Sequence, residues 1–120
     1  MIDPQRIVSI HPYFKVKPGQ EEAARVLRQQ FIARTATETK NLYYDFTLAG
    51  DRVFCREAYE GADGLLAHLE NVGSLLEEFV RLAEVLRVEV HGAADELDKL
   101  REPLAHLNPD WFVFECGVKR

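Results

Sequence analysis

Cysteine is scarce in this chain of 120 residues, which holds only Cys55 and Cys116. Both fall in predicted strand interiors without the spacing of a metal site, so we expect buried free thiols and no metal centre. The chain also lacks an apolar run of the roughly twenty residues that a membrane span needs. Its first ten residues lack the basic and apolar regions of a secretory signal. These absences predict a cytoplasmic protein with no membrane contact.

Positive charge is also in deficit. Lys and Arg number 15 against 20 Asp and Glu, which gives a formal net charge of −5. No stripe of basic residues with interleaved aromatic residues occurs, so we expect no nucleic-acid partner. An apolar content of 47% in a chain of this length predicts one globular domain over 1–120.

A strand, a tight turn and a second strand are predicted over 40–60. Tyr44 and Phe46 alternate with polar neighbours, and the turn at 49–51 contains a glycine. Before this hairpin, 6–16 predicts a strand and the following residues a helix. After it, 61–83 predicts a helical region broken near Gly73, and 85–91 a half-buried strand.

This order of elements predicts an α+β fold of the ferredoxin-like βαββαβ class, with both helices on one face of an antiparallel sheet. The core is expected over 1–92. An extension over 93–120 is expected to add a helix and a final strand over 111–116. Leucines at helical spacing predict that helix, which Pro103 should end or kink. The helix-covered sheet leaves one face bare, so we expect a homodimer in which the extension lies at the interface.

Glu57 is the exception on its strand face, which it shares with Val53, Cys55 and Tyr59. A carboxylate in this position must be solvated, paired or functional. The residues leave two interpretations open. Glu57 forms a structural ion pair with Arg52, Arg56 or Arg87, or it belongs to a functional site.

The chain resembles the antibiotic biosynthesis monooxygenase (ABM) domain family of dimeric α+β barrel proteins. The resemblance is carried by the opening VSIHPYFKVKPGQEEAARVLRQQ, by Thr37-Glu38, and by the segments LYYDFTLAGDRVFCREAYEGADGLLAHL and SLLEEFVRLAEVL. In that family the hairpin strand commonly carries a Glu, one further residue and then a Trp, and a His follows on the next helix. Here these places hold Glu57, Tyr59 and His68.

The resemblance implies a dimer with a pocket between sheet and helices, and a monooxygenase that acts on a small aromatic, phenolic or quinol-like substrate without a cofactor. Glu57, His68 and Tyr59 would then be the catalytic residues. Tyr44, His11 and Glu38 are the expected substrate-binding residues.

Two alternatives come from other classes of protein. Haem-degrading relatives carry an Asn on the first strand and a Trp on the third, whereas this chain has His11 near the first place and Tyr59 at the second. This departure argues against haem degradation. A non-enzymatic dimeric module that binds a small ligand or takes part in a stress response is the other alternative, and it would need no catalytic base.

Overall fold

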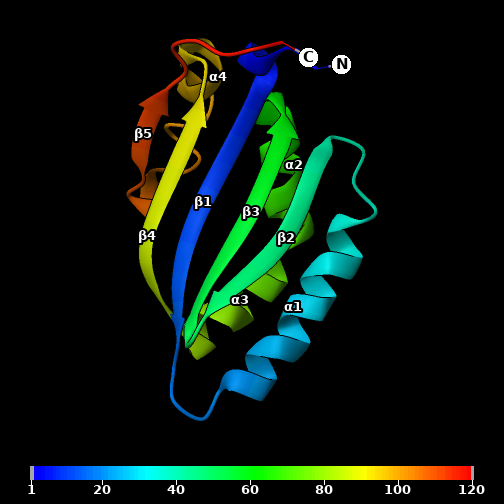
Figure 1. Ribbon diagram of the computed structural model, residues 1–120, viewed down its shortest axis with the longest axis vertical. Helices are drawn as coiled ribbons and strands as arrows, with labels where there is room; N and C mark the ends of the chain where they lie inside the picture. Colours follow the sequence, from blue (N-terminus) through cyan, green and yellow to red (C-terminus); the bar gives the residue numbers. More distant parts are fainter. Residues whose placement is uncertain (1, 120) are drawn as a thin grey trace.

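The computed structural model describes residues 2–119. The protein contains a single five-stranded sheet that is covered by helices on one face (Figure 1). The strand order is β2-β3-β1-β4-β5; the first four strands pair antiparallel, and β5 lies parallel to β4. The predicted ferredoxin-like α+β fold is therefore confirmed. The strands are β1 (Ile7–Val16), β2 (Asn41–Ala49), β3 (Arg52–Glu60), β4 (Ala83–Gly92) and β5 (Asp110–Val113). The helices are α1 (Glu21–Thr35), α2 (Gly61–Asn71), α3 (Gly73–Leu82) and α4 (Ala94–Asp98), with short 3-10 helices at Pro4–Arg6 and Ala105–Leu107.

Two features of the sequence explain the β2–β3 hairpin: the glycine in its turn and the alternation of side chains between the two faces of the sheet. Gly50 has φ of 63°, a left-handed conformation that glycine adopts at little cost. Beyond the turn, Val53, Cys55, Glu57 and Tyr59 are all buried, because alternate side chains of β3 point toward the helices. This alternation places the Glu57 carboxylate on the covered face of the sheet.

The helices cover this face with two groups of buried side chains. Phe14, Phe31 and Phe79 form the centre of one group, and their rings meet edge to face with centroids 5.0 and 5.9 Å apart. The predicted break in the second helical region is confirmed, since α2 ends at Asn71 and α3 begins at Gly73. No helix within residues 2–119 is long and apolar enough to cross a membrane.

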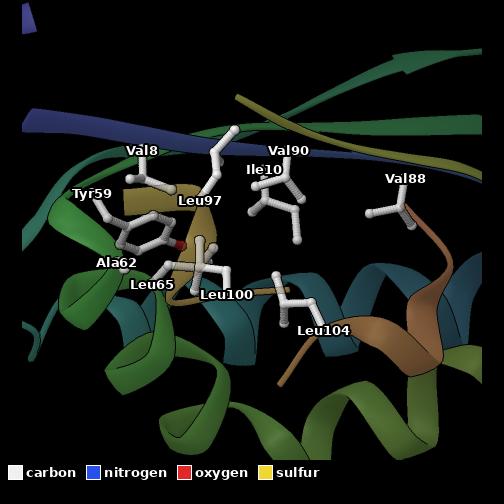
Figure 2. Close-up of a cluster of buried hydrophobic side chains, with 10 residues drawn as sticks. All are labelled: Val8, Ile10, Tyr59, Ala62, Leu65, Val88, Val90, Leu97, Leu100 and Leu104. Carbon is white, nitrogen blue, oxygen red and sulfur yellow. The ribbon is translucent and has the colours of Figure 1, made fainter. Parts of the chain in front are cut away.

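The C-terminal extension contributes to the second buried group. Leu97, Leu100 and Leu104 expose 0, 0 and 1% of their surface, and Figure 2 shows Leu104 lying below Ile10 and Val90 of the sheet. The predicted helix is much shorter than expected, because α4 ends at Asp98 and the chain continues in turns well before Pro103. β5 is also shorter than predicted and pairs with β4 of its own chain. Cys116 therefore lies beyond the strand and is exposed, so the expectation of a buried thiol is wrong for Cys116 and confirmed for Cys55. Contact of the extension with a second copy stays a prediction.

Glu96 joins the extension to the core. Its Oε1 accepts a hydrogen bond of 2.7 Å from the Ala62 N–H at the start of α2, and its Oε2 lies 3.0 Å from Lys99 Nζ. Glu96→Ala leaves a buried N–H without its partner, so the free energy of unfolding should fall by about 1–3 kcal/mol. Chemical denaturation followed by circular dichroism measures this change. Glu102→Ala, an exposed position in the same extension, is the matched control, and equal losses in both variants would contradict the role of Glu96.

Candidate active site

A cluster of polar side chains lies on the helix-covered face of the β2–β3 hairpin. Tyr44 and Glu57 are direct neighbours in the register of the two strands, and His68 of α2 lies above them. The His68 ring is 5.1 Å from the Tyr44 ring and 4.9 Å from the Tyr59 ring, measured between centroids. The hairpin and the following helix therefore bring together residues that the sequence singled out.

Glu57 is buried in this cluster, with 5% of its surface exposed. Its Oε1 accepts a hydrogen bond of 2.6 Å from the Tyr59 hydroxyl and lies 3.6 Å from His68 Nε2. Burial raises the pKa of Glu57 from 4.5 to about 7, against the lowering effect of hydrogen bonds from Tyr59 and Cys55. Near neutral pH this carboxyl group can therefore either donate or accept a proton.

Two of the three arginines that the sequence offered as partners are engaged elsewhere. Arg56 Nε lies 2.7 Å from Asp45 Oδ1 on the uncovered face of the sheet. Arg87 Nε lies 2.7 Å from Glu89 Oε2. Within residues 2–119, no arginine lies in ion-pair contact with Glu57, and its basic neighbour is the His68 imidazole. The interpretation of Glu57 as a structural Arg–Glu pair is therefore wrong for Arg52, Arg56 and Arg87.

His68 is held from its other side by Glu38. Its Nδ1 lies 2.9 and 3.2 Å from the two carboxylate oxygens of Glu38. Because an ionised carboxylate only accepts, Nδ1 carries the hydrogen, and Nε2 presents its lone pair toward Glu57. Burial lowers the pKa of His68, and the Glu38 carboxylate partly offsets this effect. His68 is thus a neutral base whose protonated form Glu38 would stabilise.

Asn71 completes this arrangement and was missed by the sequence analysis. Its Nδ2 donates to Glu38 Oε2 at 2.8 Å and to the Arg34 carbonyl at 2.9 Å, so it fixes the Glu38 carboxylate against α1. A polar residue at a helix end is common, and nothing in its sequence context marks Asn71 as a partner of Glu38.

Tyr44 and Cys55 are the remaining polar groups of the cluster. Burial raises the pKa of the Tyr44 hydroxyl and of the Cys55 thiol, and the nearby Glu57 carboxyl group adds to both effects. Both groups stay protonated at neutral pH. They can therefore serve as hydrogen-bond donors, and Cys55 lacks the thiolate character of a nucleophile.

These groups face a cavity of about 610 Å³ between the sheet, α2, α3 and the extension. Glu57, His68, Tyr44 and Cys55 line its inner part. Within residues 2–119, no group of three or more His, Cys, Asp or Glu side chains is placed to hold a metal ion. The apolar lining comprises Ile10, Pro12, Phe14, Phe31, Phe46, Leu66, Leu69, Leu76, Phe79, Val80, Val85, Val88, Pro103, Leu104 and Leu107.

The cavity does not include three of the predicted site residues. Tyr59 and Glu38 lie behind Glu57 and His68, so they position these groups and do not line the cavity. His11 lies on the uncovered face, because Ile10 before it points toward the helices. Its Nε2 is 2.8 Å from Ser9 Oγ. The prediction that His11 binds substrate together with Tyr44 is therefore not supported by its position.

The fold is that of small α+β proteins of the ABM type. A protein from Nitrosomonas europaea, described as a proposed antibiotic biosynthesis monooxygenase, has a TM-score of 0.67 at 16% identity, over 78% of this chain and 96% of its own. Another protein so described, from Caulobacter crescentus, has a TM-score of 0.65 at 17% identity, over 72% and 89% of the two chains. These likenesses show a shared fold, and they confirm the predicted resemblance at that level.

A much stronger similarity joins the chain to MupZ from Pseudomonas fluorescens. The two share 42% sequence identity over 96% of this chain and 95% of MupZ, with a TM-score of 0.91. The chain belongs to the same family as MupZ, a family with the ABM-type fold. No protein-family model matches the sequence, and no curated protein matches it significantly.

Proposed function

We propose that the chain is an enzyme that transfers protons to and from a small, largely apolar substrate in the cavity beside Glu57. The observation that carries this proposal is the contact between Glu57 and His68 at the inner part of an apolar cavity. A carboxyl group with a pKa of about 7 and a neutral imidazole form an acid–base pair suited to neutral pH. Perturbed ionisable groups of this kind are typical of functional sites.

The first chemical step is removal of a proton from an O–H or an acidic C–H of the substrate. Ionised Glu57 or His68 Nε2 would accept this proton, and Glu38 would stabilise the imidazolium that forms at His68. The Tyr44 hydroxyl, which also lines the cavity, would donate a hydrogen bond to the substrate anion.

We propose further that the reaction is a cofactor-independent monooxygenation of a phenolic or quinol-like substrate. The description of two structural neighbours as proposed antibiotic biosynthesis monooxygenases supports this chemistry. The substrate carbanion gives one electron to dioxygen, and the resulting superoxide combines with the carbon radical to form a peroxide. The O–O bond then breaks, so that one oxygen atom stays as a carbonyl and the other leaves as water. A CH₂ group and O₂ become C=O and H₂O, and the substrate supplies all four electrons.

Oxygen uptake tests this chemistry. We expect an oxygen electrode to record consumption with at least one member of a panel of hydroxylated naphthalenes and anthrones, together with a carbonyl product that incorporates ¹⁸O from ¹⁸O₂. Turnover that continues unchanged without oxygen would contradict the oxygenase assignment but would agree with the proposed proton transfer. No turnover with any panel member, in air or without it, would contradict both.

We also propose that a second copy of the chain covers the open face of the sheet. This face carries a row of rings, in which His11 and His91, and His91 and Phe112, have centroids 4.5 Å apart. Tyr43 and Phe112 expose 52 and 41% of their surface. Face-to-face packing of two sheets would bury these rings. Light scattering after size-exclusion chromatography should give twice the mass of 13.8 kDa, and a stable monomer would overturn this proposal.

A further inference from the structure

We propose that the cavity admits uncharged, elongated substrates and excludes carboxylates. The substrate lies with its oxygen-bearing end innermost. This inference rests on the proposed function only in taking the same cavity as the substrate site. It follows from where the cavity opens, from the charges that line it and from its extent across the sheet.

The opening lies between α2–α3 and the C-terminal extension, because the exposed lining residues gather there. Glu70 and Glu77 stand on the helix side and Pro103 and His106 on the extension side, with Val85 of β4 between them. The acid–base pair lies away from this opening, since Glu57 and His68 are both buried. A substrate must therefore pass the two exposed carboxylates before its leading end reaches Glu57.

The charges along this route disfavour an anion. Glu70 and Glu77 flank the opening opposite His106, and no Lys or Arg is among the residues that line the cavity within the described chain. An anion would first meet carboxylates and then lose its hydration without gaining a counter-charge, which is costly in an apolar surrounding. His68 gives little compensation, because Glu38 already neutralises its protonated form.

An uncharged oxygen atom suits the inner part of the cavity better. The Tyr44 hydroxyl and protonated Glu57 can donate hydrogen bonds to a hydroxyl or carbonyl oxygen, and His68 Nε2 can accept from a hydroxyl. The surrounding lining is aromatic and aliphatic, so the rest of the ligand should be apolar. This pattern of a few polar groups in an apolar cavity fixes orientation.

The strand order sets the length of this ligand. Glu57 lies on β3, and Val85 at the opening lies on β4, with β1 between them. Two strand spacings amount to about 10 Å. The register places Glu57 opposite Ile10 of β1, and it pairs Val85 with Phe14, which adds about 13 Å along the strands. The separation is therefore roughly 16 Å. A ligand that spans this distance is longer than two fused rings and has the length of an extended alkyl chain or of a ring that carries one. One wall along the route is Leu104 and Leu107 of the extension.

Binding of two matched compounds tests the inference independently of turnover. Isothermal titration calorimetry at pH 6.5 compares 2-naphthalenemethanol with 2-naphthoate, which share the ring system and differ in charge. We expect the alcohol to bind at least tenfold more tightly than naphthoate. Naphthoate binding as tightly as the alcohol would overturn the proposal, as would a failure of the alcohol to bind.

Two sets of variants place this discrimination in the cavity. Leu69→Trp narrows the cavity and should weaken binding of the alcohol at least tenfold, whereas unchanged affinity would locate the ligand elsewhere and overturn the proposal. The double variant Glu70→Gln and Glu77→Gln removes exposed charge and should speed association of naphthoate. Identical naphthoate association rates in this variant and the wild type would contradict the route past these carboxylates. Absence of oxygen uptake would reject the oxygenase chemistry and leave these binding results intact.

Discussion

Glu57→Gln is expected to lower kcat about 10²–10⁴-fold, the range contributed by a positioned acid or base. Glutamine keeps the size of the side chain and can still accept the hydrogen bond from Tyr59, but it neither takes nor releases a proton at neutral pH. The cavity shape and the position of His68 should persist. Binding of a neutral ligand should therefore change by less than threefold, which steady-state kinetics and calorimetry together would show.

The same variant separates an enzyme from a binding module. A module without chemistry needs no proton transfer at Glu57, so the substitution would leave its ligand affinity and dimerisation nearly unchanged. Glu60→Gln is the matched control, because Glu60 lies on the same strand, is exposed, and contacts Arg6 at only 3.9 Å. Equal kcat values for wild type, Glu57→Gln and Glu60→Gln would contradict the catalytic role of Glu57.

The sequence located Glu57 correctly on the covered face, because strand alternation depends only on the period of two along β3. It could not decide between an arginine partner and a cavity. That choice depends on which side of the sheet Arg56 and Arg87 point to, and on whether the helices and the extension leave space above the strand. Both are properties of the tertiary packing, and the structure settles them in favour of the cavity.

Two other positions show what local patterns can and cannot predict. His11 looked similar to a family position, yet its place between Ile10 and Pro12 puts the ring on the uncovered face. Asn71 contacts a residue 33 positions away, Glu38, through a helix pairing that periodicity does not encode. Alternation could have excluded His11 from the cavity. The role of Asn71 required the packing of α2 against α1.

The extension was predicted as a helix because its leucines recur at helical spacing. The structure buries Leu97, Leu100 and Leu104 but ends α4 at Asp98. The turns that follow provide the same burial, since the Leu104 N–H still bonds to the Leu100 carbonyl at 2.9 Å. Apolar spacing therefore predicted which residues are buried and gave the wrong length for the helix. This segment also forms one wall of the cavity, which its pattern did not indicate.

Glu57 should also make the stability of the protein fall as the pH rises. Its pKa is raised by burial from 4.5 to about 7, so the folded state binds the proton more tightly than the unfolded state. Below pH 4.5 both states are protonated and the group has no effect. Between pH 4.5 and 7 the carboxyl group ionises in the unfolded state only, so the free energy of unfolding falls as the pH rises. Above pH 7 the group is ionised in both states, and the free energy of unfolding has fallen by the full amount, about 3 kcal/mol.

Comparison with Glu57→Gln isolates this contribution from that of His68. The pKa of His68 is lowered by burial, so this residue acts in the opposite direction and reduces stability as the pH falls below 6.5. Both proteins contain His68, and their difference reports mainly on Glu57. We expect the free energy of unfolding of Glu57→Gln, relative to wild type, to rise by about 2 kcal/mol between pH 5 and pH 7. Urea denaturation at each pH measures it. A constant difference in the free energy of unfolding would mean that folding does not change the pKa of Glu57. A difference that falls as the pH rises would mean that the folded protein stabilises the Glu57 carboxylate as an anion.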